Sequence, residues 1–123
     1  MSERLLQGRR ILVVEDEYLI ADAVQIALQG EGAVVVGPAQ SVRKALRLLD
    51  TEVHVDCAIL DLNLGDEQVF PVADLLQARG VPFLFTTGYD AAVVPQAWRH
   101  VQRLEKPIEI AAIAHALSAS CAL

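Results

Sequence analysis

Residues 11–17 read ILVVEDE, in which four apolar residues run directly into three acidic ones. A run that is apolar in succession, rather than alternating with polar residues, is typical of a strand buried on both faces of a parallel sheet. Residues 56–62, DCAILDL, show the same arrangement, because the apolar run CAIL ends directly in an acid. The two stretches therefore predict buried strands of a parallel sheet that carry carboxylates at their ends.

Strands and helices alternate on either side of these two stretches. Further strands are expected at residues 33–37, 81–87 and 101–105, and helices at 18–29, 41–49, 69–78 and 108–118. A further helical segment is expected within 90–99, where Pro95 shortens it or makes it irregular. Strict alternation implies right-handed crossovers and a parallel sheet with helices on both faces. The sequence therefore predicts an α/β, doubly wound fold with a five-stranded parallel sheet. An eightfold barrel would need about twice this chain.

Two local signals define the first half of the chain more closely. The helix at 18–29 has apolar residues at helical spacing, namely Leu19, Ala23, Ile26 and Ala27. The dipeptide Gly37-Pro38 is expected to close the second strand.

Composition and charge exclude several classes of protein. The 123 residues suit a single domain, and a hydrophobic content of 54% argues against disorder. Ten basic residues against 16 acidic ones give a net charge of −6, which disfavours binding to nucleic acid. Two cysteines predict neither a disulfide framework nor a zinc site. We find no signal peptide and no membrane-spanning stretch, so a cytoplasmic protein without a membrane partner is expected.

Polar side chains gather at the carboxyl ends of the predicted strands. Glu15 and Asp16 follow the first strand, and Asp61 stands at the end of the third. Thr87 ends the fourth strand and Lys106 follows the fifth. Ligands of open parallel sheets bind beyond these ends, at the point where the strand order reverses. This edge is therefore the expected site.

The residue types at this edge fit phosphoryl transfer. If the first and third strands are neighbours, their three carboxylates repel one another unless a pKa rises or a cation binds. An oxygen-lined site with room for water suits Mg²⁺. Lys106 offers a positive charge for a carboxylate or phosphoryl oxygen, and Thr87 offers a hydroxyl. A nucleophilic carboxylate, a metal, a cation and a hydrogen-bond donor are the parts of such a site.

Four motifs closely resemble the CheY-like receiver domain of bacterial two-component response regulators. They are ILVVEDE (11–17), AILDLNL (58–64), FLFTTGY (83–89) and LEKP (104–107). The resemblance implies a flavodoxin-like fold with strand order 2-1-3-4-5. It implies a receiver domain over residues 8–118, with short terminal extensions at 1–7 and 119–123. We expect no output domain, as in stand-alone regulators of the chemotaxis type.

The resemblance also assigns roles to the acidic residues. Asp61 would be the phosphoacceptor, receiving a phosphoryl group from a sensor histidine kinase or a histidine phosphotransfer protein. Asp16 and Asp61 would bind Mg²⁺ directly and Glu15 through water. The backbone carbonyl of Asn63 would complete the ligands that the protein contributes.

The switch residues follow the family pattern only in part. By the resemblance, Thr87 and Lys106 would bind the phosphoryl oxygens. Receivers usually carry Tyr or Phe three residues before the lysine, and here that position is Arg103. Tyr89 is the nearest aromatic residue and is a second candidate modulator.

The implied function is a phosphorylatable single-domain response regulator that signals by altered protein–protein binding to an unknown downstream partner. It would lose the phosphoryl group by self-catalysed hydrolysis and would not be a dedicated enzyme. Two alternatives stay open, a pseudo-receiver that acts without phosphorylation and a phosphate sink for a kinase. A homodimer is also left open. An aspartate-based phosphatase is disfavoured, because Asn63 stands where such enzymes carry a second acid.

Overall fold

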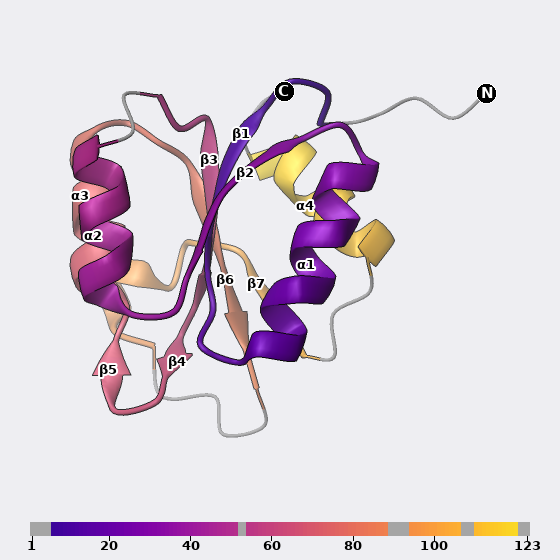
Figure 1. Ribbon diagram of the computed structural model, residues 1–123. Coiled ribbons are helices and arrows are strands. Elements are labelled where there is room, and N and C mark those ends of the chain that lie inside the picture. Colours follow the sequence, from indigo (N-terminus) through magenta and orange to yellow (C-terminus); the bar gives the residue numbers. More distant parts are fainter. Residues whose placement is uncertain (1–5, 52–53, 89–93, 107–109, 121–123) are drawn as a thin grey trace.

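The computed structural model describes residues 6–51, 54–88, 94–106 and 110–120, and it has three layers (Figure 1). The strands of the central sheet are β1 (Arg10–Val14), β2 (Val34–Ala39), β3 (Cys57–Asp61), β6 (Phe83–Thr87) and β7 (Arg103–Glu105). The helices are α1 (Tyr18–Gly30), α2 (Val42–Thr51), α3 (Phe70–Ala78) and α4 (Ile110–Ser120). Among the described residues, no helix combines the length and the apolar character needed to cross a membrane.

All neighbouring strands of the sheet are parallel, in the order β2-β1-β3-β6-β7. Numbered within the sheet, this is the order 2-1-3-4-5, so the predicted doubly wound fold is confirmed. β1 and β3 lie next to each other near the middle, and every residue of β3 is buried. Val14 pairs with Leu60, so Glu15, which follows β1, and Asp61, which ends β3, lie side by side.

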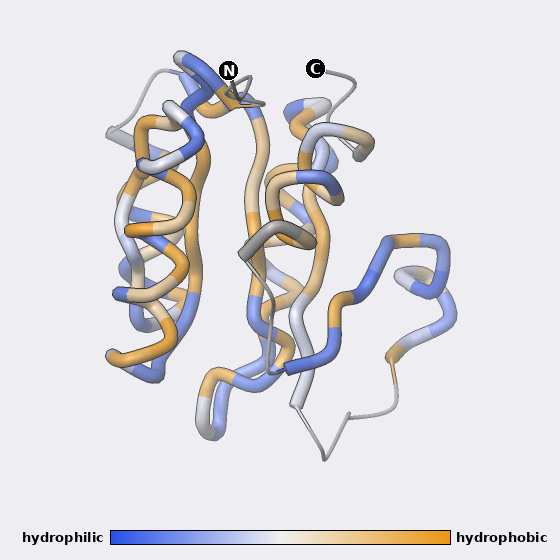
Figure 2. The backbone as a smooth tube through the Cα atoms, turned by 90° about the vertical axis from the view of Figure 1, so that its right-hand side faces the viewer, coloured by the Kyte–Doolittle hydropathy of each residue, from blue (hydrophilic) through white to orange (hydrophobic). Residues whose placement is uncertain are grey.

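Alternate residues of the strands point into two apolar cores. α1 and α4 cover one face of the sheet, and α2 and α3 cover the other (Figure 1). Ile11 and Val13 pack toward α1 and α4, whereas Leu12 and Val14 pack toward α2 and α3. Figure 2 shows hydrophobic residues along the central strands, while the helices alternate between hydrophobic and hydrophilic segments. The pattern explains why the strands are apolar in succession: both of their faces are covered.

The buried face of α1 differs from the one expected. Leu19, Ala23 and Ile26 are exposed, and only Ala27 of the predicted stripe is buried. Ala21, Val24 and Leu28 face the sheet instead, and they are also spaced as one face of a helix. The helix has apolar residues on two sides, and periodicity alone does not say which side packs.

β2 extends beyond the dipeptide that was expected to close it. The strand continues through Gly37 and Pro38 to Ala39, across an irregularity in its register with β1. Gly37 has a φ of +98°, which favours glycine, and it is followed by a cis peptide bond to Pro38. β2 is an edge strand, where a proline without an N–H is tolerated, especially at a bulge. The expectation that the strand ends at Gly37-Pro38 is therefore wrong.

A small hairpin follows β3 where only a loop was expected. β4 (Asn63–Leu64) and β5 (Glu67–Gln68) pair antiparallel around a two-residue turn that begins at Gly65, whose φ is +61°. A Gly-Asp pair between two short segments is a hairpin signal, and it was present in the sequence.

The chain between β6 and β7 is irregular where it is described. A single 3₁₀ turn, η1 (Gln96–Trp98), begins directly after Pro95. Trp98 is buried and stacks on Phe70, with ring centroids 6.2 Å apart, and it meets Phe85 edge-on at 6.4 Å. Phe83 completes this aromatic cluster. Trp98 and Phe85 are thus part of the core, and Phe83 packs against it. The predicted helical segment at 90–99 lies partly outside the described residues.

Candidate functional site

The five side chains selected from the sequence lie at one edge of the sheet. Glu15 and Asp16 follow β1, Asp61 ends β3, Thr87 ends β6 and Lys106 follows β7. These are the carboxyl ends of parallel strands, at the lower end of the molecule in Figure 1. The sheet order places β1 and β3 together in its middle, so the expected convergence is confirmed.

Three carboxylates form the centre of the site. Glu15, Asp16 and Asp61 each offer an oxygen, and these oxygens all lie within 4.8 Å of one another. Glu15 and Asp61 are buried, whereas Asp16 is partly exposed. This spacing lets one small cation contact or approach all three, and carboxylate oxygen is the ligand that Mg²⁺ prefers.

Lys106 supplies the positive charge of the site. Its Nζ lies 2.7 Å from Oε1 of Glu15 and 3.0 Å from Oδ2 of Asp61. The backbone N–H of Lys106 donates to the carbonyl of Thr87 at 2.8 Å, which attaches the start of the side chain to β6. Burial alone would lower the pKa of Lys106, but the hydrogen bonds to Glu15 and Asp61 outweigh it and raise the pKa. Lys106 is therefore firmly charged.

Glu15 carries the largest electrostatic perturbation. Burial raises its pKa to about 8, with a further rise from the hydrogen bond to Asp61, although the hydrogen bond from Lys106 acts in the opposite direction. Glu15 and Asp61 together therefore carry less negative charge than two free carboxylates would. A proton on Glu15 lowers the repulsion that the sequence implied, and a cation can displace that proton.

Asp61 is oriented by its own loop. Its Oδ2 faces Lys106, while Oδ1 accepts a hydrogen bond of 3.0 Å from the backbone N–H of Asn63. Only 1% of the residue is exposed. One oxygen of the carboxylate is thus fixed by the lysine and the other by the chain. The predicted role of the Asn63 carbonyl as a metal ligand is not tested by these contacts.

Thr87 lies at the rim of this group. The residue is buried, and its hydroxyl donates to the carbonyl of Gly88 over a long 3.4 Å. Among the described residues, the side chain of Thr87 forms no hydrogen bond with Asp61 or Lys106. The weak bond to Gly88 leaves the hydroxyl able to turn to a stronger acceptor.

A family model supports what the site geometry indicates. The response regulator receiver domain matches residues 11–118 of this chain. The chain belongs to this family.

Similar proteins include one that matches this chain over its whole length and others that are much longer. SdrG from Sphingomonas melonis Fr1 is 38% identical, with a TM-score of 0.81 over 100% of both chains. The regulator PhyR of Methylorubrum extorquens is 32% identical over 81 residues, which are 64% of this chain and 30% of PhyR. The sensory transduction protein LytT of Bacillus cereus is 33% identical over 84 residues, 66% of this chain and 34% of LytT. This receiver therefore spans about a third of the length of the latter two relatives.

The receiver departs from the family pattern at the residues expected to modulate the switch. Arg103 begins β7, is exposed, and pairs with Phe85 in register. Its side chain therefore lies on the same sheet face as Phe85 and is a diagonal neighbour of Thr87. Tyr89, the second candidate modulator, lies outside the described residues.

Two features of the site were missed in the sequence. A Cβ on Gly65 would lie 3.7 Å from Oδ2 of Asp16, so the hairpin turn borders the acidic cluster. Leu19 and Tyr18, at the start of α1, are 81% and 71% exposed, although the sequence assigned Leu19 to the packed face. Helical periodicity could have shown that α1 has apolar residues on two sides, but not which of the two sides is exposed.

Proposed function

We propose that this receiver accepts a phosphoryl group on Asp61 from a sensor histidine kinase or a histidine phosphotransfer protein. The observation that supports the proposal most directly is the placement of Asp61. Its buried carboxylate ends β3, contacts the ammonium of Lys106 at 3.0 Å and shares a 4.8 Å cluster with two further acids. The change in charge would alter the binding of a downstream partner, which makes the chain a regulator in a two-component system.

The reaction balances as a simple displacement. A carboxylate oxygen of Asp61 attacks phosphorus and forms the new P–O bond, while the P–N bond to the donor histidine breaks. The electron pair of that bond leaves with the imidazole nitrogen. Lys106 keeps its proton throughout and provides the positive charge opposite the incoming oxygens. The backbone N–H of Asn63 donates to Oδ1 of Asp61, the oxygen that Lys106 does not contact.

Mg²⁺ fits the donor set of the site. Asp16 and Asp61 would hold it directly, Glu15 through water, and the carbonyl of Asn63 would add a neutral oxygen. When bound, the ion neutralises charge on the phosphoryl oxygens. Glu15 supports this assignment, because its raised pKa means that a cation nearby can displace its proton and leave a charged carboxylate beside the ion.

Phosphorylation would change the partners of Lys106 and Thr87. The phosphoryl group adds about −1.5 to −2 charge and three acceptor oxygens at Asp61. Lys106, now shared between Glu15 and Asp61, would follow that charge, and the hydroxyl of Thr87 would give up its long bond to Gly88. The new bonds would shift an existing equilibrium between two conformations. Arg103 takes the place of the usual aromatic residue, so we propose that its guanidinium modulates this step from β7.

The exposed side of α1 is the surface that we propose for the phosphoryl donor. Tyr18, Leu19 and Ile26 are 71%, 81% and 61% exposed, and the first two begin two residues after Asp16. An exposed apolar strip beside an acidic site suits the docking of a protein that must reach Asp61. A Leu19→Ser variant should be labelled normally by acetyl phosphate but more slowly by a phosphohistidine donor.

The receiver is proposed to lose its phosphoryl group by self-catalysed hydrolysis and not to act as an enzyme on a separate substrate. A phosphate sink would undergo the same chemistry on Asp61 but would bind no downstream partner. A pseudo-receiver would not be phosphorylated at all, and Arg103 is the feature that favours it. Labelling of Asp61 therefore separates the pseudo-receiver from the other two functions.

The test is intact-protein mass after incubation with acetyl phosphate, with and without Mg²⁺. We expect a gain of one phosphoryl group that requires Mg²⁺ and disappears in Asp61→Asn. Asp74→Asn is the matched control, because Asp74 lies exposed on α3 outside the site. A wild type that gains no mass, even with a phosphohistidine donor and with Mg²⁺ bound, would overturn the proposal in favour of the pseudo-receiver.

A further inference from the structure

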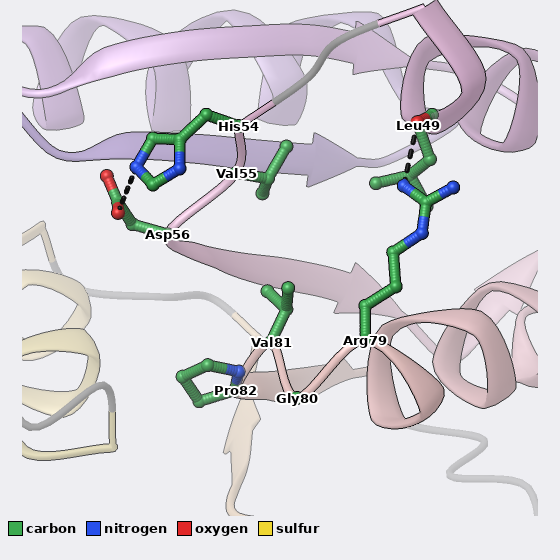
Figure 3. A pocket seen from close by; sticks show the side chains of 8 residues that line it. All are labelled: Leu49, His54, Val55, Asp56, Arg79, Gly80, Val81 and Pro82. Carbon is green, nitrogen blue, oxygen red and sulfur yellow. Dashed lines mark hydrogen bonds and ion pairs between the residues drawn. The ribbon is translucent and has the colours of Figure 1, made fainter.

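A cavity of about 350 Å³ opens at the opposite end of the sheet from Asp61. Its lining comes from the end of α2, the residues before β3 and the connection from α3 to β6: Leu49, His54, Val55, Asp56, Arg79, Gly80, Val81 and Pro82 (Figure 3). We refer to it as the basal cavity. Its volume lies at the lower end of the range for small-molecule sites. Because the cavity opens at the other end of the sheet, a ligand can occupy it without touching the acidic cluster.

The middle of the basal cavity is apolar. Val55 and Val81 face each other across it in Figure 3, with Pro82 beside Val81. All three are partly exposed to solvent, whereas most apolar side chains of the two cores are buried. A Cβ on Gly80 would meet no atom within 4 Å, so the floor is also open there. An apolar ligand body would remove this surface from water.

Arg79 provides a cation at one end of the cavity. Its Nη1 donates to the carbonyl of Leu49 at 2.7 Å, which anchors the guanidinium between α3 and α2. A guanidinium has five N–H donors, so this bond leaves others available. Among the described residues, no carboxylate forms an ion pair with Arg79. Because the group is already anchored, binding an anion costs less conformational entropy.

The opposite wall is polar but already satisfied. Nε2 of His54 lies 2.7 Å from Oδ1 of Asp56, and Oδ2 of Asp56 accepts a 2.8 Å hydrogen bond from the backbone N–H of Arg10. The side chain of Arg10 donates to the carbonyl of His54, which fixes this wall. Both oxygens of Asp56 therefore have donors, and its charge lies at the end away from Arg79 (Figure 3). An anion is directed to the Arg79 end.

We propose that the basal cavity binds a small carboxylate with an apolar body. The carboxylate pairs with the free N–H groups of Arg79, whose planar fork matches its two oxygens. The apolar body lies between Val55 and Val81 and against Pro82. This site is separate from the acidic cluster, so it does not depend on phosphorylation of Asp61.

Benzoate is a suitable probe, and binding can be followed by the backbone amide signals of the isotope-labelled protein. We expect saturable shifts of Val55, Gly80 and Val81, with a dissociation constant on the order of 1–10 mM. Acetate lacks the apolar body and benzyl alcohol lacks the charge, so each should bind about tenfold more weakly. Asp61→Asn should bind benzoate as the wild type does, which separates this result from the proposed function.

Variants of Arg79 test the assigned contact. Arg79→Gln should weaken benzoate about tenfold, and Arg79→Lys should weaken it less because the charge stays while the fork is lost. Arg47→Gln is the matched control, because Arg47 is an exposed arginine on α2 that does not line the cavity. The same spectra report whether each variant is folded. Shifts that grow linearly without saturating, or benzyl alcohol binding as tightly as benzoate in the wild type, would overturn the proposal whatever the variants do.

Discussion

Binding of Mg²⁺ should release a proton from Glu15, and both the number of protons released and its dependence on pH can be measured. The pKa of Glu15 is raised to about 8, mainly by burial. At pH 7 a group with that pKa is protonated in about nine molecules of ten. If Mg²⁺ requires the ionised carboxylate, binding at pH 7 should release about 0.9 protons and the release should fall toward zero well above pH 8.

The sign and size of the pH effect follow from the same value. Below pH 8 the proton competes with the cation, so the affinity for Mg²⁺ rises with pH. With a single proton displaced, the apparent dissociation constant should fall about fiftyfold between pH 6 and pH 8 and change little above that range. Raising the pH therefore strengthens binding, and lowering it favours the protonated Glu15 that Lys106 and Asp61 surround.

Isothermal titration calorimetry provides the assay. Titrations of Mg²⁺ at one pH in buffers of different ionisation enthalpy give the number of protons released, and a pH series gives the affinities. Glu15→Gln keeps the size of the side chain but cannot titrate, so its proton release at pH 7 should vanish. An affinity that stays constant from pH 6 to pH 8 in the wild type would refute the reasoning. A Glu15→Gln variant with undiminished proton release would refute it too.

Two further predictions concern stability, measured by urea unfolding followed by circular dichroism. Trp98→Ala should lower the free energy of unfolding by about 3–5 kcal/mol, because Trp98 is buried in the aromatic cluster; a loss below about 1 kcal/mol would contradict this packing. Gly37→Ala should destabilise by about 1–3 kcal/mol, since its φ is +98° and an added Cβ would lie 2.7 Å from the backbone N of Ala39. Gly30→Ala is the matched control in α1, where a Cβ meets nothing within 4 Å, and it should stabilise by about 0.5–1 kcal/mol; equal effects at both glycines would refute the argument from φ.

Much of the site was predictable because it depends on the ends of strands. Each site acid follows or ends an apolar run, and parallel strands place those ends at one edge whatever the details of packing. The convergence of Glu15, Asp16 and Asp61 needed only one further condition, that the first and third strands are neighbours. The resemblance to receivers supplied that order.

Local sequence could not decide features that depend on which surfaces meet. α1 has apolar residues on two sides, and only its docking on the sheet decides that Val24 and Leu28 are buried while Leu19 and Ile26 are exposed. β2 runs past Gly37 and Pro38 because it lies at an edge, where the strand needs hydrogen bonds on one side only. Edge position is a property of the assembled sheet.

The sequence by itself determined the strand and helix alternation, the polar ends of the strands and the carboxylates that they carry, because these are encoded in neighbouring residues. Tertiary structure alone decided the charges in the site. Burial and Asp61 on the neighbouring strand raise the pKa of Glu15, while Lys106, about ninety residues away, acts in the opposite direction. Together they set the free energy of its proton. Tertiary structure also created the basal cavity, where the side chain of Arg79 donates a hydrogen bond to Leu49 on α2. Such effects depend on distances between residues remote in the chain, and only folding defines those distances.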